Sequence, residues 1–118
     1  LANDDIVAVW VGWDEPATAA VRAIEQAGKS DDIFVVSHDG SSEALAMVRD
    51  GGAFELLVAY DPITMGRTAV EIVEATLAGN PPASKLLTLR PCLITAQTAP
   101  ASGQPIDFAG CKLFSGEM

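Results

Sequence analysis

The sequence is poor in residues that bind metal ions or polyanions. It has one histidine, His38, and two cysteines, Cys92 and Cys111, and their spacing matches no metal site. Its seven lysines and arginines are scattered among sixteen acidic residues, which gives a net charge of −9. Nucleic acids and anionic membrane surfaces select basic patches, so neither is an expected partner. We expect neither a metal nor a cofactor.

The sequence also lacks long apolar runs and a visible targeting signal. No stretch approaches the roughly 20 apolar residues of a transmembrane helix. The chain opens on Leu1 without the basic and apolar regions of a secretory signal, and a strand-like run follows almost at once. Its 118 residues are enough for one small domain with a core. We expect the sequence to be a piece of a longer protein.

The two cysteines allow two interpretations. Cys92 lies in an apolar, strand-like run, and Cys111 lies in a segment rich in alanine, proline, serine and glycine. We expect Cys92 to be buried and both thiols to be free. The alternative is a disulfide that ties this segment down, which would suit an oxidising compartment.

Three short apolar runs, residues 6–11, 33–37 and 56–59, define the expected fold. Runs of this length without polar alternation predict strands that are buried on both faces. A helical pattern follows each run, and strands that alternate with helices imply right-handed crossovers and a parallel sheet. The sequence therefore predicts an α/β fold, a parallel sheet with flanking helices.

Glycine, proline and capping residues mark the ends of three predicted helices. The start and stop signals are, in chain order, Pro16 and Gly28, Ser41 or Ser42 and Gly51, and Asp61 and Gly79. Two short extended pieces, residues 86–89 and 92–95, follow the third helix. From Gln97 onward the composition is that of a tail or linker.

Polar side chains follow each predicted strand. The carboxyl ends of parallel strands meet at one sheet edge, where open α/β folds bind their ligands. Asp39 follows the second strand; its carboxylate suits neighbouring hydroxyls of a polyol, and a turn or capping role is the alternative. Asp14 follows the first strand and is expected either to contact a ligand or to cap its helix. Asp61 is predicted to be a helix N-cap.

Two aromatic residues, Trp13 and Tyr60, join these clusters. An aromatic face can stack on the C–H face of a sugar ring, and the indole N–H or phenol O–H can bond a hydroxyl. Packing over the strand ends is the alternative for both residues. Trp10 lies within the first strand and is expected to pack in the core or against another lobe.

Catalytic patterns are missing from the sequence. Neighbouring residues on an extended strand point to opposite sides, so His38 and Asp39 are not expected to pair without a break in the strand. The sequence contains no Gly-x-Ser-x-Gly nucleophile turn and no phosphate-binding glycine loop. It therefore predicts a binding protein and not an enzyme.

Five short segments occur in an order and spacing typical of one family. They are residues 13–15 (Trp-Asp-Glu), 23–29 (Ala-Ile-Glu-Gln-Ala-Gly-Lys), 35–40 (Val-Val-Ser-His-Asp-Gly), 58–62 (Val-Ala-Tyr-Asp-Pro) and 65–67 (Met-Gly-Arg). Together, over about residues 3–96, they resemble the carboxyl-terminal portion of the sugar-binding type I periplasmic binding proteins. These are the ribose-binding-like solute receptors of ABC transporters.

The resemblance implies a Rossmann-like lobe that closes with a second lobe on a sugar or polyol, without chemistry. Such a receptor delivers its solute to an ABC transporter permease and works in the periplasm or outside the cell. By the same resemblance Asp39 contacts sugar hydroxyls, with Trp13, Tyr60 and Asp14 as further ligand-binding residues. Trp13 and Tyr60 stand where the family has an asparagine and a glutamine, so stacking faces replace amides and the identity of the ligand stays open.

The resemblance also divides the chain between two lobes. Residues 1–61 and 92–98 would belong to the carboxyl lobe and residues 62–91, a helix plus a strand, to the amino lobe; residues 99–118 form a tail. The amino lobe's sheet is not part of the sequence, so the apolar stripe of the third helix would lack its partner. We expect this stripe to pack onto the chain's own sheet or, preferably, against a second copy. The stripe consists of Ile63, Val70, Val73 and Leu77.

Two other functions are alternatives. The effector-binding domains of LacI-like transcriptional regulators share the scaffold, and their helix-turn-helix would lie upstream of this sequence. A receiver-type phosphoacceptor would use Asp39, but it also needs a lysine at a strand end, which is missing. The negative charge and the Ala-, Pro- and Gly-rich tail favour the secreted receptor.

Overall fold

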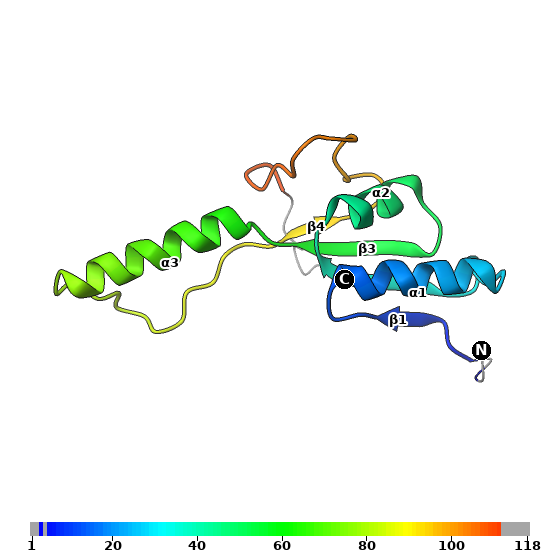
Figure 1. The fold of residues 1–118 in the computed structure, drawn as a ribbon, viewed down its shortest axis with the longest axis horizontal. Helices are drawn as coiled ribbons and strands as arrows, with labels where there is room; N and C mark the ends of the chain where they lie inside the picture. The colour runs from blue at the N-terminus through cyan, green and yellow to red at the C-terminus, as the bar shows by residue number, and fades with distance from the viewer. Residues whose placement is uncertain (1–2, 4, 112–118) are drawn as a thin grey trace, which may run out of the picture.

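The computed structural model describes residues 3 and 5–111 and shows a mixed α/β fold (Figure 1). Its elements are β1 (Ala8–Trp10), α1 (Asp14–Gln26), β2 (Phe34–Asp39), α2 (Ser42–Asp50), β3 (Phe54–Ala59), α3 (Pro62–Leu77) and β4 (Cys92–Ile94). The predicted α/β class is confirmed. Ser41 and Asp61 cap α2 and α3, as their sequence positions predicted.

The four strands form one sheet in the order β1-β2-β3-β4. The first three strands run parallel, whereas β4 pairs antiparallel with β3 and places Cys92 opposite Ala59. The carboxyl ends of β1, β2 and β3 therefore meet at one edge. The polar clusters that follow these strands are brought to that edge by the topology.

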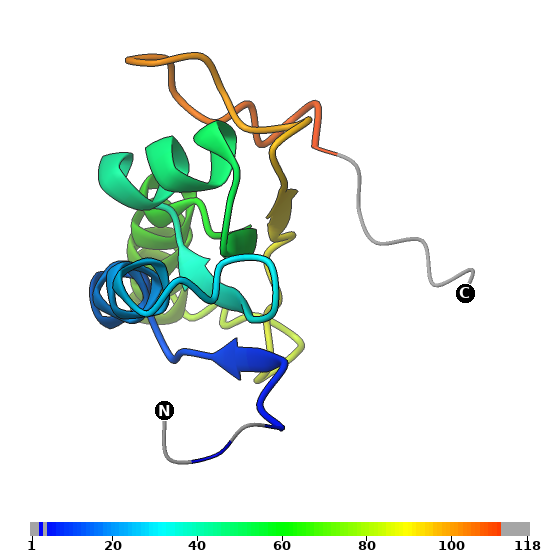
Figure 2. The same ribbon diagram turned by 90° about the vertical axis from the view of Figure 1, so that its right-hand side faces the viewer.

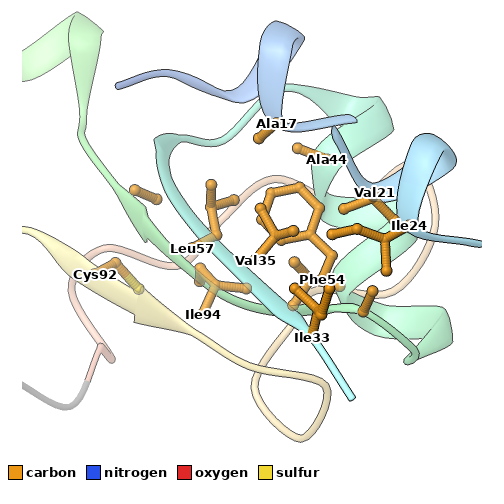
Figure 3. Packing of buried hydrophobic residues seen from close by; sticks show 13 residues of the cluster. Ala17, Val21, Ile24, Ile33, Val35, Ala44, Phe54, Leu57, Cys92 and Ile94 are labelled. Atoms are coloured by element: carbon orange, nitrogen blue, oxygen red, sulfur yellow. The ribbon is translucent and has the colours of Figure 1, made fainter. Parts of the chain in front are cut away.

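The core lies between the sheet and two helices. The strands β1, β2 and β3 are added to the sheet in one direction, and their crossovers have the same hand. Helices α1 and α2 therefore lie on the same face of the sheet (Figure 2). The ring of Phe54 fills the layer between them, close to Val21 of α1 and Ala44 of α2 (Figure 3). Burying side chains of this size contributes roughly 1.5–3 kcal/mol each to the stability of this layer.

The opposite face of the sheet carries no helix among the described residues (Figure 2). Burial alternates along β2, and Trp10 on β1 is 71% exposed. The prediction that the strands are buried on both faces is therefore wrong, because both crossovers place their helices on the same side. Trp10 does not lie in the core, and its ring centroid is 6.4 Å from that of His38.

Helix α3 extends away from the sheet and buries none of its residues (Figure 1). The predicted stripe is open to solvent, with exposed fractions from 58% at Val70 and Val73 to 84% at Leu77. The stripe therefore does not pack onto the chain's own sheet, which was the first expected arrangement. Residues 86–89 form no strand, because no described strand lies beside them to complete a ladder.

The cysteines form a disulfide between Cys92 and Cys111, with their Cα atoms 5.4 Å apart. Cys92 is buried as predicted, but the expectation of two free thiols is wrong. Residues 99–111 do not trail away as a tail. Ile106 and Phe108 pack against the core, and this contact brings Cys111 back to the start of β4. Residues 112–118 of the predicted tail lie outside the described residues.

Candidate functional site

An open cleft of about 720 Å³ lies at the carboxyl edge of the sheet. It is lined by residues of the turns after β1, β2 and β3, of the first turns of the helices that follow them, and of the segment after residue 103. Three of the four predicted ligand-binding residues line it: Asp14, Asp39 and Tyr60. Sequence order alone separates these residues by up to 46 positions, and the parallel sheet brings them together.

Asp14 joins the first two strand ends. Its side chain is buried, and Oδ2 accepts hydrogen bonds from the backbone N–H groups of Gly40, at 3.0 Å, and Ser41, at 2.5 Å. The N-cap of its own helix is Trp13, which makes no side-chain capping bond. Asp14 therefore holds the β2–α2 turn instead of capping α1, and this turn carries Asp39 into the cleft.

Asp39 sits in an unusual backbone conformation for a residue with a side chain. Its φ is 105°, and the following Gly40 has a φ of 110°. This break at the end of β2 turns the Asp39 side chain toward His38, whose Nδ1 lies 3.0 Å from Asp39 Oδ1. The expectation that the two side chains do not pair is wrong, because the positive φ ends the strand's alternation. The Asp39 side chain stays half exposed and available to a ligand.

The two predicted aromatic walls differ in position. Tyr60 lines the cleft, is 40% exposed, and meets the His38 ring edge-on at a centroid distance of 5.6 Å. Trp13 is 55% exposed at the same sheet edge, but it is not among the residues that line the cleft. The structure thus brings Tyr60 together with Asp39 and leaves Trp13 beside them.

Asp61 fixes the start of α3. One carboxylate oxygen accepts from the N–H groups of Ile63 and Thr64, and the other accepts from the Thr64 hydroxyl at 2.6 Å. These bonds, the Thr64 hydroxyl first among them, lower the pKa of the Asp61 carboxyl below its usual value. The prediction of an N-cap is confirmed, so Asp61 holds the helix that forms one side of the cleft.

The sequence reasoning missed one side of the cleft. Gln104, Pro105, Ile106 and Phe108 line it, although they belong to the predicted tail. Gly40 has a φ of 110°, and a Cβ there would lie 3.2 Å from Ile106 Cδ1, so both the backbone conformation and the close approach favour glycine. The available signal was the pair of apolar residues near Cys111, together with the disulfide alternative.

The cleft combines carboxylate acceptors, hydroxyl groups and two aromatic rings, those of Tyr60 and Phe108, a set that suits a polyhydroxylated molecule. Within residues 3 and 5–111, no three His, Cys, Asp or Glu side chains are grouped as metal ligands. No helix in that part of the chain has the length and apolarity to cross a membrane. The arrangement can bind by hydrogen bonds and ring contact.

Comparisons with known proteins point to one family. The sequence profile described as "periplasmic binding protein domain" matches residues 1–81. The chain is 35% identical over 79 residues to the ribose import binding protein of Salmonella typhimurium. This match covers 67% of this chain and 26% of that protein. The chain spans about a quarter of the length of the curated relatives that it matches.

Two solved structures are similar in fold and sequence. One is an ABC transporter solute binding protein from Agrobacterium vitis with bound allitol. Its TM-score is 0.73 at 32% identity, over 80% of this chain and 32% of that one. The other is the 5-methylthioribose transporter solute binding protein of Thermotoga lettingae, in complex with 5-methylthioribose. Its TM-score is 0.65 at 40% identity, over 77% and 29% of the two chains.

Proposed function

This chain belongs to the periplasmic binding protein domain family, and from that membership we propose that it forms part of the solute-binding component of an ABC importer. The component binds a sugar or polyol between two lobes, without chemical change, and presents it to a transporter permease. The observation that carries this proposal is the cleft in which Asp39 and Tyr60 meet at one sheet edge.

The chemistry of the cleft supports a sugar or polyol. Asp39 offers carboxylate oxygens that can accept from two neighbouring hydroxyls, and Tyr60 offers a ring face together with a hydroxyl. Trp13, exposed beside the cleft, adds a second aromatic surface for a ligand held between lobes. The relatives agree with this class, since their names and bound molecules are ribose, allitol and 5-methylthioribose.

The disulfide favours the receptor over the regulator. Disulfides persist in the periplasm and outside the cell and are rare in cytosolic proteins, where LacI-like regulators act. The Cys92–Cys111 bridge therefore supports a protein that works in an oxidising compartment. Binding without catalysis fits the family, whose members are transport components.

Replacing Asp39 by alanine is expected to weaken binding of the best ligand at least about tenfold, because hydrogen bonds to a charged acceptor are lost. The complete protein is first screened by thermal shift against sugars and polyols, since a bound ligand raises the melting temperature. Isothermal titration then compares wild type and variant. The matched control is Asp31→Ala, an exposed aspartate before β2, far from the cleft. Unchanged affinity in Asp39→Ala would contradict the site.

We propose the division into lobes for the longer protein. Residues 1–61 and 92–98 belong to the carboxyl lobe, and residues 62–91 cross into the amino lobe. The position of α3 supports this division. The chain leaves the sheet at the end of β3, runs through α3, and returns to pair with β3 at β4 (Figure 1). Its exposed apolar stripe would then pack on a sheet of the amino lobe.

The 118-residue chain by itself is expected to self-associate through α3, because four apolar side chains of the stripe stay exposed. A lysine at the stripe, Val73→Lys, should shift the chain toward monomer in sedimentation velocity runs over a range of concentrations. The control is Glu71→Lys, which puts the same charge on another face of the helix. A wild-type chain that remains a compact monomer at every concentration would refute this expectation.

A further inference from the structure

We propose that residues 99–111, fastened by the Cys92–Cys111 disulfide, form a ligand-binding wall and that Gln104 supplies its carboxamide to the bound sugar or polyol. This inference rests on the proposed function and deepens it. Gln104 lines the same cleft as Asp39 and Tyr60. The wall lies beside the strand ends, since Ile106 Cδ1 would be 3.2 Å from a Cβ built on Gly40.

Gln104 adds a carboxamide to the groups that line the cleft. Asp14, Asp39 and Asp61 are acceptors when ionised, and the turns add hydroxyl groups. Gln104 is the one carboxamide among the described lining residues. A carboxamide both donates and accepts, so it can bond a hydroxyl in either orientation. Such a group discriminates between stereoisomers that place a hydroxyl differently.

The Gln104 side chain is free to make this contact. Its backbone N–H donates to the Ala101 carbonyl at 2.9 Å, which fixes the turn. No hydrogen bond joins its carboxamide to another described residue. Gln104 lines both the cleft and a second hollow of about 420 Å³ beside α2. A bound ligand would select the cleft side.

Three attachments hold the wall in place. Arg49 of α2 donates to the Pro100 carbonyl at 3.3 Å, near the start of the segment. Ile106 packs against Gly40 and the core in the middle, and Cys111 is bonded to Cys92 at the end. A segment fastened at both ends and in the middle can present a side chain with little loss of conformational entropy on binding.

The wall lies outside the stretch that the family profile matches. That match covers residues 1–81, and the wall begins at residue 99. The strand-end residues then set the class of ligand, whereas the wall sets the preference within that class. Ligand preference is therefore expected to differ from what residues 1–81 alone would indicate.

The test is calorimetric titration of the complete protein with ribose, allose and allitol, each separately. Gln104→Leu keeps the volume of the wall and removes both donor and acceptor. The affinity for the ligand that wild type binds most tightly should fall about three- to tenfold, and the order of the three affinities should change. Cys111→Ser removes the disulfide that fastens the wall and should lower the affinity for the same ligand. Gln26→Ala, at the exposed end of α1, is the control and should bind as wild type.

The outcomes separate this inference from the function on which it rests. If wild type binds and Asp39→Ala does not, while Gln104→Leu keeps wild-type affinity and ranking, Gln104 has no ligand role and the inference fails alone. If wild type binds none of the three ligands and no compound from the wider screen, the proposed function fails and the inference fails with it. A Gln104→Leu variant that loses affinity at an unchanged melting temperature without ligand supports the contact.

Discussion

Replacing Asp14 by alanine is expected to lower the free energy of unfolding by about 2–4 kcal/mol, because two backbone donors lose a buried, charged acceptor. Oδ2 of Asp14 accepts from both Gly40 and Ser41, and its side chain is almost completely buried. Removing it leaves two N–H groups at the start of the β2–α2 turn without their partner. Urea denaturation of the complete protein measures the loss.

Two further substitutions make the Asp14 experiment interpretable. Asp14→Asn keeps one acceptor oxygen in the same place, so it should lose less stability than Asp14→Ala. Glu25→Ala, on the exposed side of the same helix, should change the free energy of unfolding by no more than about 0.5 kcal/mol. An Asp14→Ala protein as stable as Glu25→Ala would show that the buried carboxylate does not hold the turn.

Reduction of the Cys92–Cys111 disulfide is expected to cost about 3 kcal/mol of stability, because an open chain of this length gains conformational freedom when unfolded. The bridge closes a loop between positions 19 residues apart. Urea unfolding with and without a phosphine reductant measures the difference.

The reductant supplies its own control. Cys111→Ser should be as unstable as the reduced wild type, and the reductant should not change it further. Cys111 is the better position to substitute, because Cys92 is buried in the core and a serine there would add a buried hydroxyl. The unreduced protein can also be unfolded and alkylated. If both cysteines are labelled, the bridge does not exist in solution and no loss of stability on reduction is expected.

Much of the fold could be predicted because its signals are local. Asp61 followed by Pro62 starts a helix through the side-chain oxygen and the fixed φ of proline, and both effects act within one turn. The apolar runs and the glycines after each helix similarly mark the ends of the βα units. The parallel direction of strands joined by helices then decides which strand ends share an edge, which is why Asp39 and Tyr60 were expected together.

The errors came from relations between distant segments. Burial on both faces depends on which helices cover the sheet, and no strand's own residues contain that information. The return of Cys111 to Cys92 depends on Ile106 and Phe108 finding the core across a segment without regular structure. The His38–Asp39 pair depends on a single positive φ at a strand end, which an aspartate only occasionally adopts.

The loop closed by the disulfide excludes α3, and this has a consequence for the covalent continuity of the molecule. One peptide-bond cleavage between residues 93 and 110 leaves a single covalent molecule, because the bridge still joins the two sides of the cut. One cleavage between residues 62 and 91 produces two polypeptides with no covalent bond between them. The second polypeptide would carry β4 and the wall, held to the first without a covalent bond, by the β3–β4 ladder, by the Arg49–Pro100 hydrogen bond and by packing such as that of Ile94. The covalent attachment of residues 99–111 to the first three strands therefore depends on an unbroken backbone through the exposed helix α3.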